Sequence, residues 1–510
     1  MKHSLLVLIC ALASMVLYAQ KAHFVTISPT DSERDIIQKA ANIVPTPRQL
    51  RWQELELTAF FHFGVNTFTG REWGTGKEDP KIFNPQKLNA EQWVKTVKDA
   101  GFKQVIITAK HHDGFCLWPT KTTTHSVKSS PWKDGNGDVV KEVAEACKKL
   151  NVGFGVYLSP WDMNAPIYGT DEYNDFFVDQ LTELLTWYGK VDEVWFDGAN
   201  GEGPNGKKQV YAFERWYQLI RKLQPEAVIA IMGPDVRWVG TETGVGRAQE
   251  WSVVPTNQLD QQSIAESSQK DMIFKPQGDM MGEDLGSRAK IRNAKGLVWY
   301  PAETDVSIRP GWFYHKDQDA KVKTPEHLMN IYFTSVGMNG VLLLNIPPNK
   351  DGLIEQADIN SLQQWTADRK KIFSKNLLKR ASVKSNNSIN AKSIKDGKNY
   401  THLTTRGNDT TTTIHIRLCG KKTFNILSLQ ENIRVGQRVE KFSAWYDDNG
   451  SWKKFTEGTT IGYKRLLLFE KITAKKIKIE IEASRLNPTI AEVGLYYGAA
   501  LQPAKPASGQ

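Results

Sequence analysis

The stretch from Val191 to Gly198 reads Val-Asp-Glu-Val-Trp-Phe-Asp-Gly, an apolar run that ends in a carboxylate and then breaks at glycine. Period-two alternation places Glu193, Trp195 and Asp197 on one face of a strand. Asp197 would then lie at the carboxyl end of that strand, where parallel α/β barrels build their active sites. An aspartate that caps the following turn fits this short stretch equally well.

Other polar and aromatic residues stand at the ends of neighbouring apolar runs. His62 lies between Phe61 and Phe63, and His111-His112-Asp113 closes the next run. Tyr157 and Ser159 share one face of the run after that. Several such residues at successive strand ends indicate a site at the mouth of a barrel.

The three histidines also raise the alternative of a zinc or iron hydrolase. Adjacent side chains of an extended chain project in different directions, which argues against both His111 and His112 as ligands. The sequence has no helical histidine pair four residues apart. We therefore expect neither a metal site nor a cofactor.

Short apolar strands alternate with amphipathic helices from residue 57 onward, which predicts parallel β/α units. Asn89 caps one such helix and Gly101 closes it. The pattern predicts a (β/α)₈-like, TIM-type catalytic barrel over residues 20–360. The eight expected strands are Thr58–Phe63, Gln104–Ala109, Phe154–Leu158, Glu193–Asp197, Val228–Met232, Gln249–Val253, Leu297–Ala302 and Val341–Ile346.

Residues 376–498 change to Thr-, Ser-, Asn- and Lys-rich runs with strand alternation, which predicts a β-sandwich, and residues 499–510 are expected to be a disordered tail. This sandwich could support the barrel, or it could bind sugar with Trp445 and Trp452 as platforms. Residues 376–510 hold 23 Lys and Arg against 11 Asp and Glu, so they carry the basic excess of the chain. Lysines spread over strands are typical of a solvated face, and no motif indicates nucleic acid as a partner.

The N-terminus has an apolar run from Leu5 to Leu17, which is too short to span a bilayer and is typical of a secretory signal. We expect residues 1–19 to be a signal peptide cleaved near Ala19, and the protein to be periplasmic or secreted without membrane insertion. Beyond the signal, Cys116, Cys147 and Cys419 are odd in number and widely spaced. Disulfides are therefore not expected to form the framework of the fold.

Several motifs together resemble the α-L-fucosidases of glycoside hydrolase family 29. They are Phe-His-Phe-Gly at residues 61–64, Arg-Glu-Trp-Gly at 71–74, Ala-Lys-His-His-Asp-Gly-Phe at 109–115, Tyr-Leu-Ser-Pro-Trp-Asp at 157–162, Val-Trp-Phe-Asp-Gly at 194–198 and Asp-Val-Ser-Ile-Arg-Pro-Gly-Trp-Phe at 305–313. The resemblance implies a retaining exo-glycosidase with Asp197 as the nucleophile. It implies Glu242 as the acid/base, because residues 237–244 are similar to the segment that carries this role in one subfamily, with Glu250 as the second choice.

The same resemblance assigns the sugar pocket and the substrate. Residues implied to bind or enclose fucose are His62, Glu72, Trp73, His111, His112, Tyr157, Trp195 and Trp312, the last packing on the C5 methyl. The implied partners are fucosylated oligosaccharides or glycoconjugates. The context of Glu242 resembles the subfamily that acts on α-1,3/1,4-linked, Lewis-type fucose, whereas Met163 and Ala165 depart from the family pattern after the Ser-Pro-Trp-Asp motif. A degenerate barrel that binds fucosylated glycans without cleaving them is the alternative from another functional class.

Overall fold

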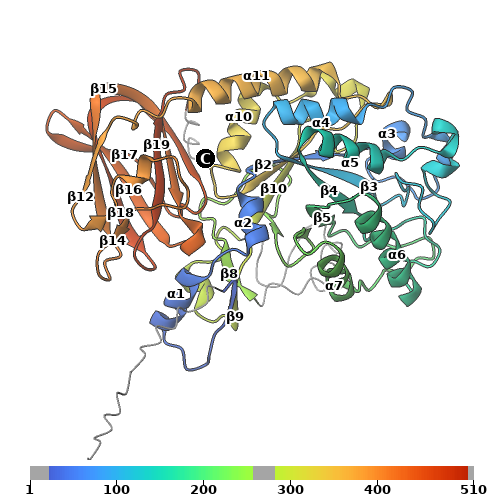
Figure 1. The fold of residues 1–510 in the computed structure, drawn as a ribbon, viewed down its shortest axis with the longest axis horizontal. Coiled ribbons are helices and arrows are strands. Elements are labelled where there is room, and N and C mark those ends of the chain that lie inside the picture. The colour runs from blue at the N-terminus through green and yellow to red at the C-terminus, as the bar shows by residue number, and fades with distance from the viewer. Residues whose placement is uncertain (1–21, 257–281, 503–510) are drawn as a thin grey trace, which may run out of the picture.

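A computed structural model describes residues 22–256 and 282–502 of the chain. The expected signal peptide, residues 1–19, and most of the expected C-terminal tail lie outside the described residues. Of the tail, Leu501 is described, and its carbonyl oxygen accepts a hydrogen bond of 3.1 Å from Asn425. Figure 1 shows two parts side by side, a barrel with its helices and a separate body of strands, joined by the long helix α11 (Gln356–Phe373).

Eight parallel strands form the barrel in the order β6-β5-β4-β3-β2-β11-β10-β7. They are β2 (Leu57–Phe61), β3 (Gln104–Lys110), β4 (Gly153–Leu158), β5 (Glu193–Phe196), β6 (Val228–Ile231), β7 (Arg237–Trp238), β10 (Ala302–Ser307) and β11 (Val341–Asn345). A parallel bridge between Ala230 and Val236 brings the two ends of this path together, so the barrel is nearly closed. The predicted (β/α)₈-like fold is confirmed.

The helices cover the outside of the barrel as the apolar periodicity predicts. They include α4 (Ala90–Asp99), α5 (Val139–Leu150), α6 (Asp171–Trp187), α7 (Phe213–Leu223) and α10 (Pro325–Thr334). At the start of α4 the Asn89 side chain accepts a hydrogen bond from the backbone N–H of Gln92. Each helix buries one face, as α4 does with Trp93, Val94 and Val97, and those faces pack on the outer surface of the strands.

Two of the eight expected barrel strands were wrong. The segments predicted at 249–253 and 297–302 instead contribute β8 (Val253–Pro255) and β9 (Gly296–Trp299), which form an antiparallel sheet with β1 (Phe24–Thr26) in the order β1-β9-β8. The barrel positions belong to β7 and β10. Strand β7 has only two residues, which is too few to show a periodic pattern. Strand β10 buries the acidic residues Glu303 and Asp305, so its sequence does not read as the apolar run expected of a barrel strand.

The C-terminal part is an antiparallel β-sandwich, as predicted. Its main strands are β12 (Ser382–Ser385), β15 (Thr412–Glu431), β16 (Val439–Asp448), β17 (Ser451–Gly458), β18 (Arg465–Ser484) and β19 (Ile490–Tyr496), and the short strands β13 (Ser388–Ile389) and β14 (Thr404–Thr405) form a separate pair. Strands β15 and β18 pair along most of their length, with register shifts between Arg417 and Lys422 and between Phe424 and Ile426. Shifts of this kind bend a strand, so both strands can pass from one layer to the other around a shared apolar core.

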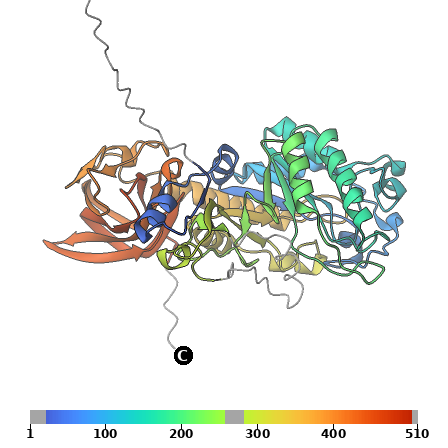
Figure 2. The same cartoon turned by 90° about the horizontal axis from the view of Figure 1, so that it is seen from below.

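The sandwich packs closely on the segment that leads from β7 to β8. The Arg485 guanidinium lies 3.6 Å from the centre of the Trp251 ring, and the Gln437 side chain bonds the backbone of Glu250 and Ser252. The view from below in Figure 2 shows helix α1 (Glu33–Asn42) against the same side of the sandwich. These contacts support the structural role weighed for this domain.

The alternative role for the sandwich, sugar binding at Trp445 and Trp452, stays a prediction. The Lys478 ammonium lies close to both rings, 5.0 Å from the centre of Trp445 and 5.2 Å from that of Trp452. In the described parts of the chain, no helix combines the length and the apolar character that crossing a membrane requires.

Candidate active site

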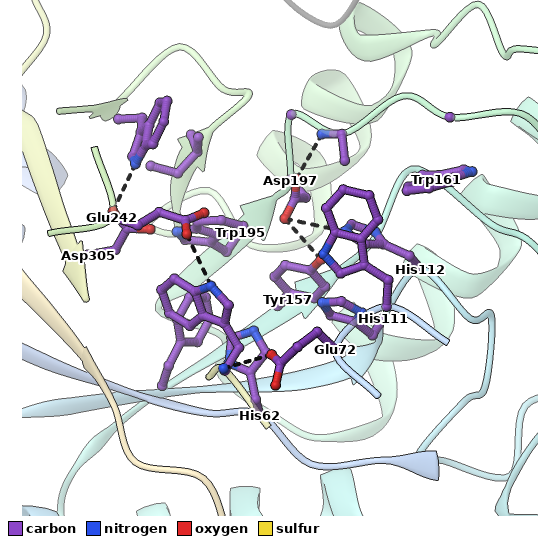
Figure 3. Close-up of a pocket in the computed structure, with 18 of the residues that line it drawn as sticks. His62, Glu72, His111, His112, Tyr157, Trp161, Trp195, Asp197, Glu242 and Asp305 are labelled. Carbon is purple, nitrogen blue, oxygen red and sulfur yellow. Dashed lines mark hydrogen bonds and ion pairs between the residues drawn. The ribbon is translucent and has the colours of Figure 1, made fainter. Parts of the chain in front are cut away.

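A cavity of about 580 Å³ opens at the carboxyl ends of the barrel strands. Asp197, Glu242 and all eight side chains expected to bind sugar line it together, as the close-up in Figure 3 shows for most of them. The full lining is Phe60, His62, Glu72, Trp73, His111, His112, Tyr157, Trp161, Trp195, Asp197, Gly198, Ala199, Gly201, Glu202, Lys208, Ile231, Trp238, Glu242, Asp305 and Trp312. Residues up to 252 positions apart in the sequence therefore meet in one place, because the parallel strands end at one edge of the barrel.

Asp197 follows β5 directly and presents its carboxylate to the cavity. One oxygen, Oδ2, accepts a hydrogen bond of 3.1 Å from the Tyr157 hydroxyl. The other, Oδ1, accepts one of 2.8 Å from the backbone N–H of Ala199. These two bonds fix the orientation of the carboxylate, and the side chain stays 26% exposed, so a ligand in the cavity can reach it.

Glu242 lies in the turn that follows β7 and faces the same cavity. Its Oε2 accepts a hydrogen bond of 3.2 Å from the Trp312 indole N–H. Although the residue is exposed at the mouth, the protein around its carboxyl raises its pKa by desolvation, and the charges of Asp197 and Glu72 raise it further. A carboxylic acid with a raised pKa beside an orientated carboxylate is an arrangement that suits proton donation.

The histidines of the cavity are neutral. Burial lowers the pKa of His62 to about 3 and also lowers that of His112. The Nδ1 of His62 donates to the Asn345 amide oxygen (2.9 Å), and that of His112 contacts Ser159 Oγ (2.8 Å), whose own proton goes to the Trp161 carbonyl. This leaves Nε2 of each ring as an acceptor, and the Nε2 of His112 lies 3.9 Å from Asp197 Oδ2.

Glu72 holds the loop that carries Trp312. Its Oε2 accepts hydrogen bonds from the backbone N–H groups of Trp312 (2.8 Å) and Phe313 (3.3 Å), and its Oε1 lies 2.6 Å from His315 Nε2. A Cβ at Gly311 would lie 2.4 Å from Glu72 Oε1, which explains the glycine there. Glu72 therefore acts on the cavity chiefly by positioning Trp312.

Aromatic rings form most of the remaining wall. The Tyr157 and Trp195 rings stack at 5.1 Å between centres, and His111 stacks on the other side of Tyr157 at 5.6 Å. Trp73, which is 42% exposed, meets the His112 ring edge-on at the rim. Flat apolar rings among directional acceptors are typical of sites that bind a small sugar.

Glu250, the second choice for the acid/base, does not line the cavity. It is 1% exposed, forms an ion pair with Arg237, and lies 3.4 Å from Arg247. Glu250 fell within the expected barrel strand Gln249–Val253, whereas this segment lies outside the barrel and packs against the sandwich. Glu250 is therefore a structural residue.

We expect Glu250→Gln to lower the midpoint of thermal unfolding by several degrees, because removing one partner of a buried pair costs about 3–5 kcal/mol. Circular dichroism melts would measure this change. The matched control is Glu226→Gln, since Glu226 pairs with Arg51 on the surface and its loss should leave the midpoint unchanged. Equal midpoints for Glu250→Gln and the parent protein would contradict the structural role.

Sequence reasoning gave no role to six polar or aromatic residues of the cavity: Phe60, Trp161, Glu202, Lys208, Trp238 and Asp305. Trp161, Trp238 and Asp305 stand within the segments quoted above. Asp305 accepts a hydrogen bond of 2.8 Å from the Trp238 indole, and burial together with the charge of Glu242 raises its pKa well above the usual value. Trp238 ends β7, which has only two residues, so the sequence did not place it in the barrel.

Within residues 22–256 and 282–502, no three His, Cys, Asp or Glu side chains are grouped as metal ligands would be. The Nδ1 atoms of His62 and His112 face Asn345 and Ser159. Cys116, Cys147 and Cys419 are free thiols, the first two of them buried.

Comparison with known proteins gives a consistent result. The family model described as alpha-L-fucosidase matches residues 28–367. Alpha-L-fucosidase 1 of Arabidopsis thaliana is 43% identical over 89% of this chain and 87% of its own length. A solved structure of a candidate α-L-fucosidase from Bacteroides ovatus is 50% identical with a TM-score of 0.84, covering 96% of this chain and 80% of that one. A family 29 fucosidase of Ruminococcus gnavus, solved with fucose, is 33% identical with a TM-score of 0.78, over 93% and 97% of the two chains.

Proposed function

Since this chain belongs to the α-L-fucosidase family, glycoside hydrolase family 29, and is a hydrolase of that class, we propose that it is a retaining exo-α-L-fucosidase. It removes terminal fucose from glycans through a covalent fucosyl-enzyme. The observation that carries this proposal is the pair of carboxyl groups in one cavity, Asp197 orientated by two hydrogen bonds and Glu242 with a raised pKa.

The two carboxyl groups divide the work of a double displacement. Asp197 attacks the anomeric carbon while Glu242 gives its proton to the departing oxygen. Glu242, now ionised, then takes a proton from water, which attacks the fucosyl-enzyme and restores Asp197. A retaining mechanism calls for a separation of about 5–5.5 Å between such carboxyl groups.

The other cavity residues bind the sugar. The Nε2 atoms of His62 and His112 accept hydrogen bonds from fucose hydroxyl groups, because both rings are neutral and their Nδ1 atoms are already engaged. Trp312 covers the C5 methyl, the apolar corner of a 6-deoxy sugar, and Glu72 holds it there. His111, Trp73 and Trp195 complete the pocket wall.

We expect Tyr157→Phe to lower kcat by about 10- to 100-fold, because the change removes a hydrogen bond to a charged carboxylate that steers it toward the anomeric carbon. The KM should change little, since the ring stack with Trp195 stays in place. Steady-state kinetics on an aryl α-L-fucoside would measure both constants. A kcat equal to that of the parent protein would contradict the role given to this hydroxyl.

For linkage, we propose a preference for α-1,3/1,4-linked fucose on branched, Lewis-type glycans. It is supported by the resemblance of residues 237–244 to the subfamily with that preference. The test is a panel of an aryl α-L-fucoside, Lewis-type trisaccharides and 2′-fucosyllactose. Faster release from the 2′-linked substrate would overturn the linkage, and binding of these glycans without release of fucose would favour a binding protein over an enzyme.

We further propose that the protein is exported to the periplasm or beyond the cell. The apolar run from Leu5 to Leu17 followed by Ala19 supports this proposal. N-terminal sequencing of the mature protein should begin close to Gln20. Recovery of the chain with its first 19 residues intact in the cytoplasm would contradict export.

A further inference from the structure

Two glutamates that the mechanism does not use lie inside the barrel: Glu193 on β5 and Glu303 on β10. Both have no exposed surface. The Trp195 indole N–H donates to Glu303 Oε1 (2.7 Å), while the Gln104 amide (2.5 Å) and the Trp52 indole (3.1 Å) donate to Glu193 Oε2. All three donors are uncharged.

The second oxygen of each glutamate, Glu193 Oε1 and Glu303 Oε2, forms no hydrogen bond with any described residue. Burial raises the pKa of both carboxyl groups, and the charge of Glu193 raises that of Glu303 further. The negative charges of Asp192 and Asp235 also raise the pKa of Glu193. Two buried anions would repel each other, so the pair retains a proton, and one proton between the two unbonded oxygens would satisfy both.

A direct path of contacts joins this pair to the nucleophile. Trp195, held by Glu303, lines the cavity and stacks on Tyr157, its register partner on β4. The Tyr157 hydroxyl in turn donates to Asp197. Since the Trp195 ring can rotate only if its N–H leaves Glu303, the carboxyl pair fixes the surface on which Tyr157 rests.

We propose that Glu193 and Glu303 form a proton-sharing carboxyl pair that positions Trp195, and through Trp195 and Tyr157 the carboxylate of Asp197. This inference rests on the proposed role of Asp197. Glu193 and Glu303 are positioning residues, since neither touches the cavity.

Two variants of Glu303 separate its hydrogen bonds from its shape. In Glu303→Gln the amide oxygen accepts from Trp195 and the amide nitrogen donates to Glu193, so kcat should stay within about 3-fold of the parent protein. In Glu303→Leu the Trp195 N–H and the Glu193 carboxyl lose their partner, and kcat should fall by on the order of 10-fold or more, with a smaller change in KM. If Glu303→Leu has the kcat of the parent protein, the positioning role is overturned. It is also overturned if kcat falls equally in Glu303→Gln and Glu303→Leu.

The shared proton has its own readout, which does not need activity. A carboxyl group with a raised pKa in the folded state binds a proton that the unfolded chain has released, so stability falls as pH rises from the ordinary glutamate pKa toward the raised one. The parent protein should lose thermal stability between pH 5 and pH 8 through this pair. Glu303→Gln removes the titrating proton and should reduce that loss by about 3 °C in the unfolding midpoint.

The control for the melting series is Glu226→Gln, which replaces a surface glutamate and should keep the parent's pH dependence. If Glu303→Gln also keeps it, the proton-sharing pair is overturned. A failure of the proposed function is distinguishable, because full activity in Asp197→Ala would remove the catalytic premise and leave the melting series unchanged.

Discussion

Asp197→Ala should lower fucose release by at least about 10³-fold, because the variant lacks the group that we propose to form the covalent intermediate. The fold should survive, since Asp197 is partly exposed and its partner Tyr157 is held in strand β4. Rates on an aryl α-L-fucoside, with a melting curve of the same preparation, would measure both.

Azide gives this prediction a stereochemical test. The cavity left by the carboxylate of Asp197 admits a small anion, which then attacks the substrate directly in a single displacement. Activity should return in part, and the product should be the β-fucosyl azide, with the anomeric configuration inverted. An α-fucosyl azide would contradict the nucleophile assignment. A variant that keeps the activity of the parent protein without azide, and that azide does not activate, would also contradict it.

A matched control is available on the same segment. Asp192 precedes β5 and accepts a hydrogen bond of 3.1 Å from the backbone N–H of Phe154, on the side of the barrel away from the cavity. Asp192→Asn can keep that bond and should keep kcat. A comparable loss of kcat in both variants would mean that replacing any acidic residue near β5 disturbs the protein. The loss in Asp197→Ala would then not support a nucleophile role.

Local pattern was sufficient to place Asp197, because period-two alternation in β5 fixes which residues point inward and where the strand ends. The same reasoning failed for β7 and β10. A two-residue strand has no period, and the inward Glu303 and Asp305 reverse the polarity that a barrel interior normally shows. Those two carboxyl groups are stabilised by indole N–H groups of Trp195 and Trp238, partners that no local pattern reveals.

The candidate site, like the fold, could be predicted from the sequence only in part. Each quoted motif contributes at least one residue to a single cavity, since the motifs lie at or after the carboxyl ends of barrel strands. The choice between Glu242 and Glu250 depended on the path of the chain after β7. Only the structure shows that Glu250 turns under the sandwich and pairs with Arg237, while Glu242 stays at the mouth.

Glu242→Gln should separate substrates by their leaving group. A sugar leaving group needs a proton, so release from a Lewis-type trisaccharide should fall by about 10²–10⁴-fold. An activated aryl group departs with little help, so the first step on an aryl fucoside should be much less affected. Pre-steady-state kinetics should then show a burst of the aryl alcohol, because the second step still needs the base that the variant lacks.

The pH profile is the second part of this prediction. The donor must be protonated, and desolvation with the charge of Asp197 raises the pKa of Glu242, so in the parent protein kcat/KM on a natural glycan should fall as pH rises through that raised value. Glu242→Gln cannot lose a proton, and its small residual rate should show no such alkaline limb. If the variant shows the same alkaline fall in kcat/KM at the same pH, another group causes that fall.

Azide separates the two catalytic roles by stereochemistry. In the proposed mechanism, Glu242→Ala still forms the fucosyl-enzyme on Asp197, and azide takes the place of water and attacks it from the face that the leaving group left. The product should therefore be the α-fucosyl azide, opposite to the β product expected from Asp197→Ala. Because Glu250 is held by Arg237 outside the cavity, Glu250→Gln should give neither azide product. An α-fucosyl azide from the Glu250 variant, with none from Glu242→Ala, would move the acid/base role to Glu250 and require the segment after β7 to rearrange when substrate binds.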